Sequence, residues 1–122
     1  MGKIGVLAMT TKRSKYNAKK VECDGHVFDS KKEYERYLVL KDMERRGEIS
    51  QLTLQPRMQL FPAFRTEEGK YYRETVYVAD FSYLQNGMRV YEDVKSPATR
   101  TQLYMLKKKL AAMNGYEVVE VM

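Results

Sequence analysis

Two aspartates and a lysine lie close to a predicted turn of the chain. Asn86-Gly87 is typical of a two-residue β-hairpin turn, so Gln85 would pair with Met88 and paired residue numbers would sum to 173. Asp80 and Asp93 form such a pair, and Lys95 follows two residues later. Paired residues point to one face of a sheet, and this pair is of the closer, non-hydrogen-bonded type, with Cβ atoms about 5 Å apart. The spacing predicts two carboxylates and an ammonium group side by side.

Like charges placed directly opposite each other destabilise a sheet. A divalent cation between the two aspartates would remove that repulsion, because Mg²⁺ prefers carboxylate oxygens and keeps several waters. The alternatives are that one aspartate is protonated, or that both point into open water. The face is expected to be only partly wet, because it also carries Val76, Val78 and Leu84.

Two carboxylates and a lysine on adjacent strands suit the cleavage of a phosphodiester. The carboxylates would hold one or two Mg²⁺ ions, which activate a water molecule and offset charge on the scissile phosphate. Lys95 would orient that water or stabilise the developing negative charge.

The rest of the pattern predicts the elements that would hold these residues. Asp24-Gly25 is a second hairpin turn, and Ser30 is expected to be the N-cap of a helix. The expected elements, in chain order, are a hairpin over 20–28, a helix from 31 to about 46, a strand over 49–60 that bends at Pro56, strands over 71–85 and 88–95, a helix over 99–113, and a strand over 116–121 that is parallel to the preceding one. The fold class is therefore α/β, in which a helix, a three-strand antiparallel meander, a helix and a strand form a mixed sheet flanked by helices.

Asp80 and Asp93-Val94-Lys95, set in that order of elements, resemble the PD-(D/E)XK nuclease superfamily. The closest resemblance is to small phage endonucleases, with similarity to Holliday junction resolvases. Ala79 stands where the family's name expects proline. The resemblance implies a restriction-endonuclease-like core and Mg²⁺-dependent hydrolysis of DNA, with Mn²⁺ able to substitute. It also implies a phage or prophage origin and a role on recombination or replication intermediates.

Glu33 has two interpretations. As the third residue after Ser30 it could act only as a capping-box partner of the helix. Residues 28–33 also resemble the start of the family's first helix, where a glutamate often completes the metal site. The expected catalytic residues are therefore Asp80, Asp93, Lys95 and Glu33, and the expected metal ligands are Asp80, Asp93 and Glu33.

The predicted second helix has an apolar face and a basic face. Leu103, Leu106, Leu110 and Met113 are expected to face the core. The candidate nucleic-acid-binding residues on the other side are Arg100, Tyr104, Lys107 and Lys108. A basic helix face is more often simply solvated, but beside a phosphodiester-cleaving site we expect it to contact the phosphate backbone.

The chain has 122 residues and a net charge of +6, which its N-terminal end accounts for. Residues 1–20 hold six of the 22 basic residues and no acid, which leaves 16 basic and 16 acidic residues in the remainder. We expect a basic, flexible arm over residues 1–18 and a single nuclease-like domain over 19–122. The arm could bind a polyanion or could act as a solubilising tail. Either Met1 or Met9 could be the natural start.

A cytoplasmic location in a bacterial host is expected. Cys23 is the only cysteine, so no internal disulfide can form, and no apolar run is long enough to cross a bilayer. DNA is the expected partner, and a homodimer stays open because resolvases of this kind act as dimers. The alternative function is a catalytically inactive nuclease-fold protein that binds nucleic acid.

Overall fold

The computed structural model describes residues 20–122, and the expected basic arm over residues 1–18 lies outside this range. In chain order the elements are β1 (Val21–Cys23), β2 (His26–Phe28), α2 (Lys31–Arg45), β3 (Ser50–Leu54), β4 (Arg57–Phe61), β5 (Phe64–Arg65), β6 (Tyr71–Tyr72), β7 (Thr75–Val78), β8 (Phe81–Gln85), β9 (Met88–Val94), the 3₁₀ turn η1 (Pro97–Thr99), α3 (Gln102–Met113) and β10 (Val118–Val121).

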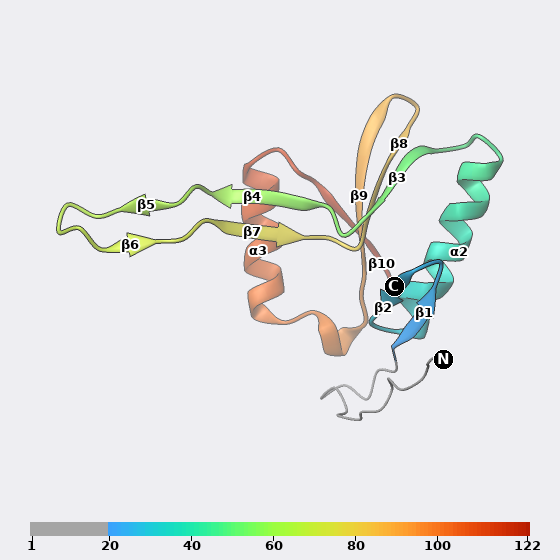
Figure 1. The fold of residues 1–122 in the computed structure, drawn as a ribbon, viewed down its shortest axis with the longest axis horizontal. Helices are drawn as coiled ribbons and strands as arrows, with labels where there is room; N and C mark the ends of the chain where they lie inside the picture. The colour runs from blue at the N-terminus through green and yellow to red at the C-terminus, as the bar shows by residue number, and fades with distance from the viewer. Residues whose placement is uncertain (1–19) are drawn as a thin grey trace.

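The central sheet has the strand order β10-β9-β8-β3. β3 is antiparallel to β8 and β8 is antiparallel to β9, whereas β10 is parallel to β9 after the crossover through α3. The predicted α/β class and mixed sheet are confirmed. In Figure 1 the sheet lies between α2 on one side and α3 on the other. No helix within residues 20–122 is long and apolar enough to cross a membrane.

The helix α2 begins directly after Ser30, the N-cap that the sequence predicts. The Oγ atom of Ser30 accepts a hydrogen bond from the N–H of Glu33 at 3.1 Å, which satisfies a backbone donor that the helix leaves unpaired. Tyr37 and Leu40 then bury the face of α2 that packs against the sheet. The apolar cluster under α2 consists of Phe28, Tyr37, Leu40, Ile49, Phe81 and Tyr83.

The turn between β8 and β9 also follows its signal. Asn86 and Gly87 both have positive φ angles, of 54° and 78°, as a tight turn that matches the strand twist requires. The pairing runs from Gln85–Met88 to Phe81–Glu92, so the predicted register is confirmed over these positions.

The prediction of one continuous strand over 71–85 was wrong. The chain divides it into β6, β7 and β8, with Ala79 and Asp80 between β7 and β8. The N–H of Asp80 bonds the carbonyl of Glu92 at 3.0 Å, although Glu92 already pairs with Phe81. Two residues thus oppose one, as in a β-bulge, which bends the strand.

The neighbouring strand breaks at the same point, and Pro56 marks the break as predicted. Gln55 has a φ of 54°, its N–H bonds the carbonyl of Asp80 at 3.0 Å, and the N–H of Ala79 bonds the carbonyl of Pro56 at 3.1 Å. Here the chain leaves the sheet and forms a separate ribbon from β4 and β7.

This break also reverses the inward side of the strand. In a continuous strand, alternation would place Tyr77, Ala79, Phe81 and Tyr83 on one face of the sheet. Instead, Tyr77 and Ala79 pack in a second cluster under α3, whereas Phe81 and Tyr83 pack under α2. Strict alternation fails because the bulge at Asp80 shifts its phase.

The predicted core face of the second helix was wrong as well. Leu103 is 62% exposed and Met113 is 77% exposed, and Leu106 is also exposed, whereas Tyr104 and Ala111 are buried. α3 therefore packs the side that carries Tyr104 against β4, β7 and β10. The helix itself begins at Gln102, because Pro97–Thr99 forms a separate 3₁₀ turn and Thr101 caps α3.

Candidate active site

The two predicted aspartates lie together where β8 meets the bulge. Each carboxylate bonds the backbone of the opposite strand. The Oδ1 atom of Asp93 accepts from the N–H of Asp80 at 3.0 Å, and the Oδ2 atom of Asp80 accepts from the N–H of Val94 at 2.8 Å. The two acids therefore lie close together on neighbouring strands, but the regular register ends at Phe81–Glu92, so the predicted direct pairing of Asp80 with Asp93 is replaced by the bulge.

Asp93 lies on the side of the sheet that α3 covers. It is buried, and the hydroxyl of Tyr77 donates to its second oxygen, Oδ2. The pKa of Asp93 is raised to about 6, chiefly by burial and also by the neighbouring Asp80 carboxyl, while the Tyr77 hydroxyl and the charge of Lys95 oppose the rise. Burial and the bond to Asp93 in turn raise the pKa of Tyr77, so this phenol stays a donor.

Asp80 is the acid most strongly affected by its surroundings. Burial raises its pKa to about 8, and the neighbouring Glu33 carboxyl adds to the rise through a hydrogen bond and its charge. The Val94 N–H and the charge of Lys95 lower it only in part. Burial and the adjacent Glu33 therefore favour the protonated form of Asp80 when no cation is bound.

Glu33 lies at the cap of α2 and beside Asp80, and its role as a metal ligand stays a prediction. Its backbone N–H is capped by Ser30, and its carboxylate accepts from the N–H of Asp29 at 3.1 Å. The same carboxyl group reaches Asp80. Both side chains line a hollow of about 440 Å³, which is bounded by the β1–β2 hairpin, Leu54, Gln55 and Phe81.

Lys95 brings the positive charge to this cluster. Its Nζ lies 4.0 Å from the centre of the Tyr104 ring, and its charge lowers the pKa values of both Asp80 and Asp93. The Nζ of Lys32, on α2, donates to the carbonyl of Lys95 at 3.1 Å. Asp80, Asp93, Lys95 and Glu33 thus lie in one region, although Lys95 forms no ion pair with these acids within residues 20–122, and we call these four residues the carboxylate cluster.

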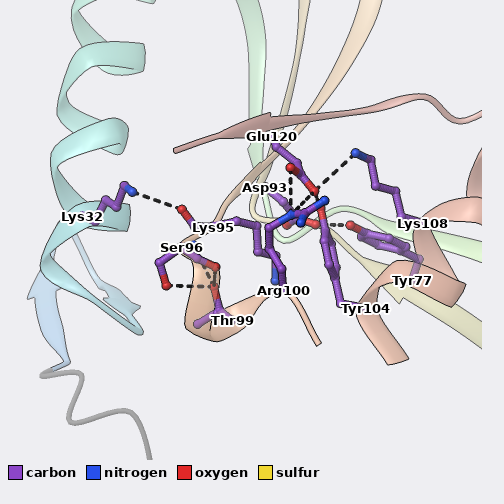
Figure 2. A network of polar contacts seen from close by, with 10 residues as sticks. All are labelled: Lys32, Tyr77, Asp93, Lys95, Ser96, Thr99, Arg100, Tyr104, Lys108 and Glu120. Atoms are coloured by element: carbon purple, nitrogen blue, oxygen red, sulfur yellow. Dashed lines mark hydrogen bonds and ion pairs between the residues drawn. The ribbon is translucent and has the colours of Figure 1, made fainter. Parts of the chain in front are cut away.

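The predicted basic face of α3 is not free in this structure. Figure 2 shows Glu120 of β10 among Arg100, Tyr104 and Lys108. The Tyr104 hydroxyl donates to Glu120 at 2.8 Å, the Arg100 Nε lies 3.2 Å from it, and the Lys108 Nζ lies 3.3 Å from it. Burial alone would raise the pKa of Glu120, but these three donors lower it. Lys107 is half-buried and forms no ion pair within residues 20–122.

Comparison with known proteins gives one family. Residues 13–121 match the family model described as a protein of unknown function, DUF1064. The chain belongs to the DUF1064 family. No curated protein and no solved structure matches it significantly.

In this DUF1064 chain, an arginine of α2 holds Glu92 of β9. Glu92 is 2% exposed, and its carboxylate accepts two bonds from Arg36, at 2.9 and 2.7 Å, and one from the Tyr83 hydroxyl. The paired guanidinium explains how a carboxylate is tolerated under α2. Glu92 therefore fixes β9 to α2 one residue before Asp93.

The sequence of this DUF1064 chain did not point to Tyr77 or Glu120, two residues near the carboxylate cluster. Tyr77 binds Asp93, and Glu120 pairs with Asp93 in the parallel register of β9 and β10. Tyr77 has only its position three residues before Asp80 as a signal. Glu120 had no usable signal, because a crossover connection leaves the register of a parallel pair undefined.

The donor set of this DUF1064 chain fits a hard divalent cation. Within residues 20–122 no three His, Cys, Asp or Glu side chains are already arranged to hold a metal ion. Mg²⁺ needs fewer, since it commonly binds one or two carboxylates and keeps waters and substrate phosphates as its other ligands. Each oxygen of Asp80 and Asp93 keeps a lone pair beyond its hydrogen bond, so the pair can bind a cation without losing its backbone contacts.

Proposed function

We propose that this chain is a metal-dependent endonuclease that hydrolyses phosphodiester bonds in DNA. The observation that carries the proposal is the pairing of Asp80 and Asp93 at the bulge, with Lys95 beside both and Glu33 against Asp80. A chain selected for stability alone would not keep buried acids close together. A reaction that requires Mg²⁺ or Mn²⁺ at a phosphate would explain why these acids are close together.

Each member of the carboxylate cluster has a role in this proposal. Asp80 and Asp93 would hold the cation, and Glu33 would add a third carboxyl group next to Asp80. The cation supplies the polarisation of the phosphate and the activation of water. Lys95 donates to the attacking water or to the charged phosphate oxygens, and the Tyr104 ring and Lys32 hold it in position.

The order of elements supports the finer assignment of the fold. α2, the antiparallel strands β3, β8 and β9, then α3 and the parallel β10 follow the order of the restriction-endonuclease-like core. A phage or prophage origin, a cytoplasmic location in the bacterial host and action on recombination or replication intermediates follow from the same resemblance and belong to the proposal. Lys107 is the residue of the basic helix face that is best placed to meet a phosphate, because Glu120 holds its neighbours.

A cleavage assay tests the proposal. Wild type, Asp80→Asn, Asp93→Asn and Lys95→Ala would be incubated with linear, flapped and four-way DNA in Mg²⁺, Mn²⁺ or EDTA. Wild type should nick DNA only with metal, each aspartate variant should be inactive, and Lys95→Ala should lose about 10²–10³-fold in rate. The matched controls are the exposed residues in Glu117→Gln and Lys109→Ala, which should cut at the wild-type rate.

The alternative is a nuclease-fold protein that binds DNA without cutting it. The observation that favours it is that both oxygens of Asp93 already accept hydrogen bonds. Metal-independent DNA binding by wild type and all variants, with no nicking under any condition, would select this alternative and reject the endonuclease.

A further inference from the structure

A two-stranded ribbon leaves the fold directly at the carboxylate cluster. Residues 57–78 form this ribbon from β4 paired with β7 and from β5 paired with β6. In Figure 1 β5 and β6 lie farther from the rest of the fold than any other labelled strand. Its root is the Gln55–Asp80 crossing, so β7 leads straight into Asp80. Whatever contacts the ribbon is therefore linked to the cluster by one short, hydrogen-bonded segment.

The inner and outer parts of the ribbon differ in what they bury. Met58, Leu60 and Tyr77 of the inner part are buried against α3. In the outer part, residues 61–74, no side chain is buried. A two-stranded ribbon without a core behind it gains little from apolar side chains, so folding does not explain large ones there.

The outer ribbon nevertheless carries four exposed aromatic residues. Phe61, Phe64, Tyr71 and Tyr72 are between 42% and 53% exposed. The Phe64 and Tyr72 rings are stacked, with centroids 5.2 Å apart and planes at 16°. Exposed aromatic side chains of this kind, on a protruding element, are suited to stacking against another planar group.

Cations are interleaved with these rings. The Arg65 guanidinium lies 5.2 Å from the Tyr71 ring centre, and the Lys70 ammonium lies 5.1 Å from that of Tyr72. Arg57 and Arg73 lie nearer the root, where they line one shallow hollow with Glu74 and Val76. The outer ribbon also carries three acids, Glu67, Glu68 and Glu74. None of these four cations forms an ion pair in the part of the chain that the structure describes. They differ in this from Arg100 and Lys108, which Glu120 holds.

We propose that the outer ribbon is a second nucleic-acid contact, which binds unpaired bases of a DNA substrate by stacking. Rings offer their faces to bases, and the neighbouring cations neutralise the phosphates, which is the arrangement that single-stranded nucleic acid requires. Paired bases in a duplex keep their faces covered, so the ribbon selects flapped or branched DNA over intact duplex. The inference rests on the proposed function for its link to cutting, but the binding itself is independent of it.

Binding in the absence of cleavage tests the ribbon directly. The full-length chain would be titrated in EDTA against fluorescein-labelled oligo(dT), blunt duplex and flapped duplex, with fluorescence anisotropy as the readout. Tyr71→Ala/Tyr72→Ala should weaken oligo(dT) and flap binding by about tenfold or more, and should change duplex binding less. Tyr71→Phe/Tyr72→Phe keeps both rings and should bind as wild type. Met88→Ala, at an exposed position on the β8–β9 turn, is the control.

Two results would overturn the inference. One is unchanged affinity of the alanine variant for oligo(dT). The other is a wild-type dimer in light scattering that the alanine variant converts to a monomer while DNA affinity stays the same, which would make the ribbon a subunit contact. If the alanine variant does not fold, photo-crosslinking of wild type to a thiothymidine oligonucleotide decides, because the adducts must fall within residues 61–74.

Failure here is distinguishable from failure of the endonuclease proposal. Ribbon-dependent binding without any nicking would reject the endonuclease and keep the ribbon. Metal-dependent nicking with ribbon variants that bind and cut like wild type would reject the ribbon and keep the endonuclease.

Discussion

Within the carboxylate cluster, Asp80 is the residue whose pKa is changed most by its surroundings. Its carboxyl group is held by Val94 from the strand β9 and meets Glu33 from the N-terminus of α2. Burial and Glu33 raise its pKa to about 8 from an ordinary value of 3.8. In the absence of a cation, the raised pKa favours a proton on Asp80, and this proton reduces the repulsion between the neighbouring carboxyl groups.

That proton makes the stability of the metal-free chain depend on pH. Between about pH 4 and pH 8 the folded state holds the Asp80 proton and the unfolded state does not, so the free energy of unfolding should fall as pH rises. Asp80→Asn removes the ionisation, and an amide can still accept from Val94 and donate to Glu33. The variant should melt at least about 4 °C above wild type at pH 8.5 in EDTA, with a much smaller difference at pH 5.

Thermal denaturation followed by circular dichroism at the two pH values measures this effect. Asp29→Asn, an exposed carboxylate on the same loop as the α2 cap, is the matched control and should show no such pH-dependent gain. An Asp80→Asn variant that melts below wild type at pH 8.5 would mean that the ionised carboxylate is stabilised by its surroundings.

Among the helices and strands, the starts and turns that depend on a few neighbouring residues could be predicted. The point at which a strand is interrupted could not. Asn86-Gly87 set the register of β8 and β9, and Ser30 set the start of α2, because each signal acts within a few residues. The bulge at Asp80 has no such local signal. It arises where the chain passes from the sheet to the ribbon, and it decides which side Tyr77 and Phe81 face.

The inverted face of α3 has a similar origin. Leu103, Leu106 and Met113 have helical spacing, which indicates an apolar face but not which face the fold buries. The ribbon and β10 provide an apolar surface for Tyr104 and Ala111 and an acid for the adjacent cations. These partners are more than 20 residues away, since Tyr77 is 27 residues before Tyr104, or follow an undefined parallel register, so the helix sequence alone could not reveal them.

Paired substitutions on α3 test this packing. Ala111 is fully buried, so Ala111→Leu should overpack the cluster and destabilise the chain by about 1–3 kcal/mol. Leu106 is exposed, so Leu106→Gln should change the free energy of unfolding by no more than about 0.5 kcal/mol. Urea denaturation of both variants gives the values. The reverse order of effects would restore the leucine face as the core face.

The contact between α2 and β9 yields a second prediction at this scale. Arg36→Ala would leave Glu92 buried with only the Tyr83 hydroxyl as a donor, which should cost roughly 3 kcal/mol of stability. Urea denaturation at pH 7 measures the loss, with the exposed Arg89→Ala as its control. A loss no larger than that of the control would show that Arg36 does not neutralise Glu92.

At the scale of the whole molecule, the carboxylate cluster lies where three parts of the fold meet. The N-terminus of α2 supplies Glu33, the end of the central sheet supplies Asp80, Asp93 and Lys95, and the ribbon begins at the adjoining Ala79. The positive end of the α2 dipole lies close to these acids and favours their charged forms. The carboxylates of the cluster therefore lie next to both the N-terminus of α2 and the base of the ribbon.

The same arrangement explains how far sequence reasoning could reach. Asp80, Asp93 and Lys95 could be placed near one another because a tight turn and a two-residue spacing relate them locally. Glu33 was assigned to the site only through the family resemblance. Tyr77, Glu120 and the outer ribbon were not predictable, because their roles depend on the bulge, on the parallel pairing of β10 and on the departure of the chain from the sheet.

A crystal of the full chain soaked in Mn²⁺ tests the central claim most directly. Mn²⁺ scatters anomalously and accepts the same oxygen ligands as Mg²⁺. The account predicts an anomalous peak about 2.1 Å from oxygens of both Asp80 and Asp93, which disappears in Asp80→Asn crystals. Well-ordered aspartates with no peak between them, at millimolar Mn²⁺ and pH 8, would contradict it.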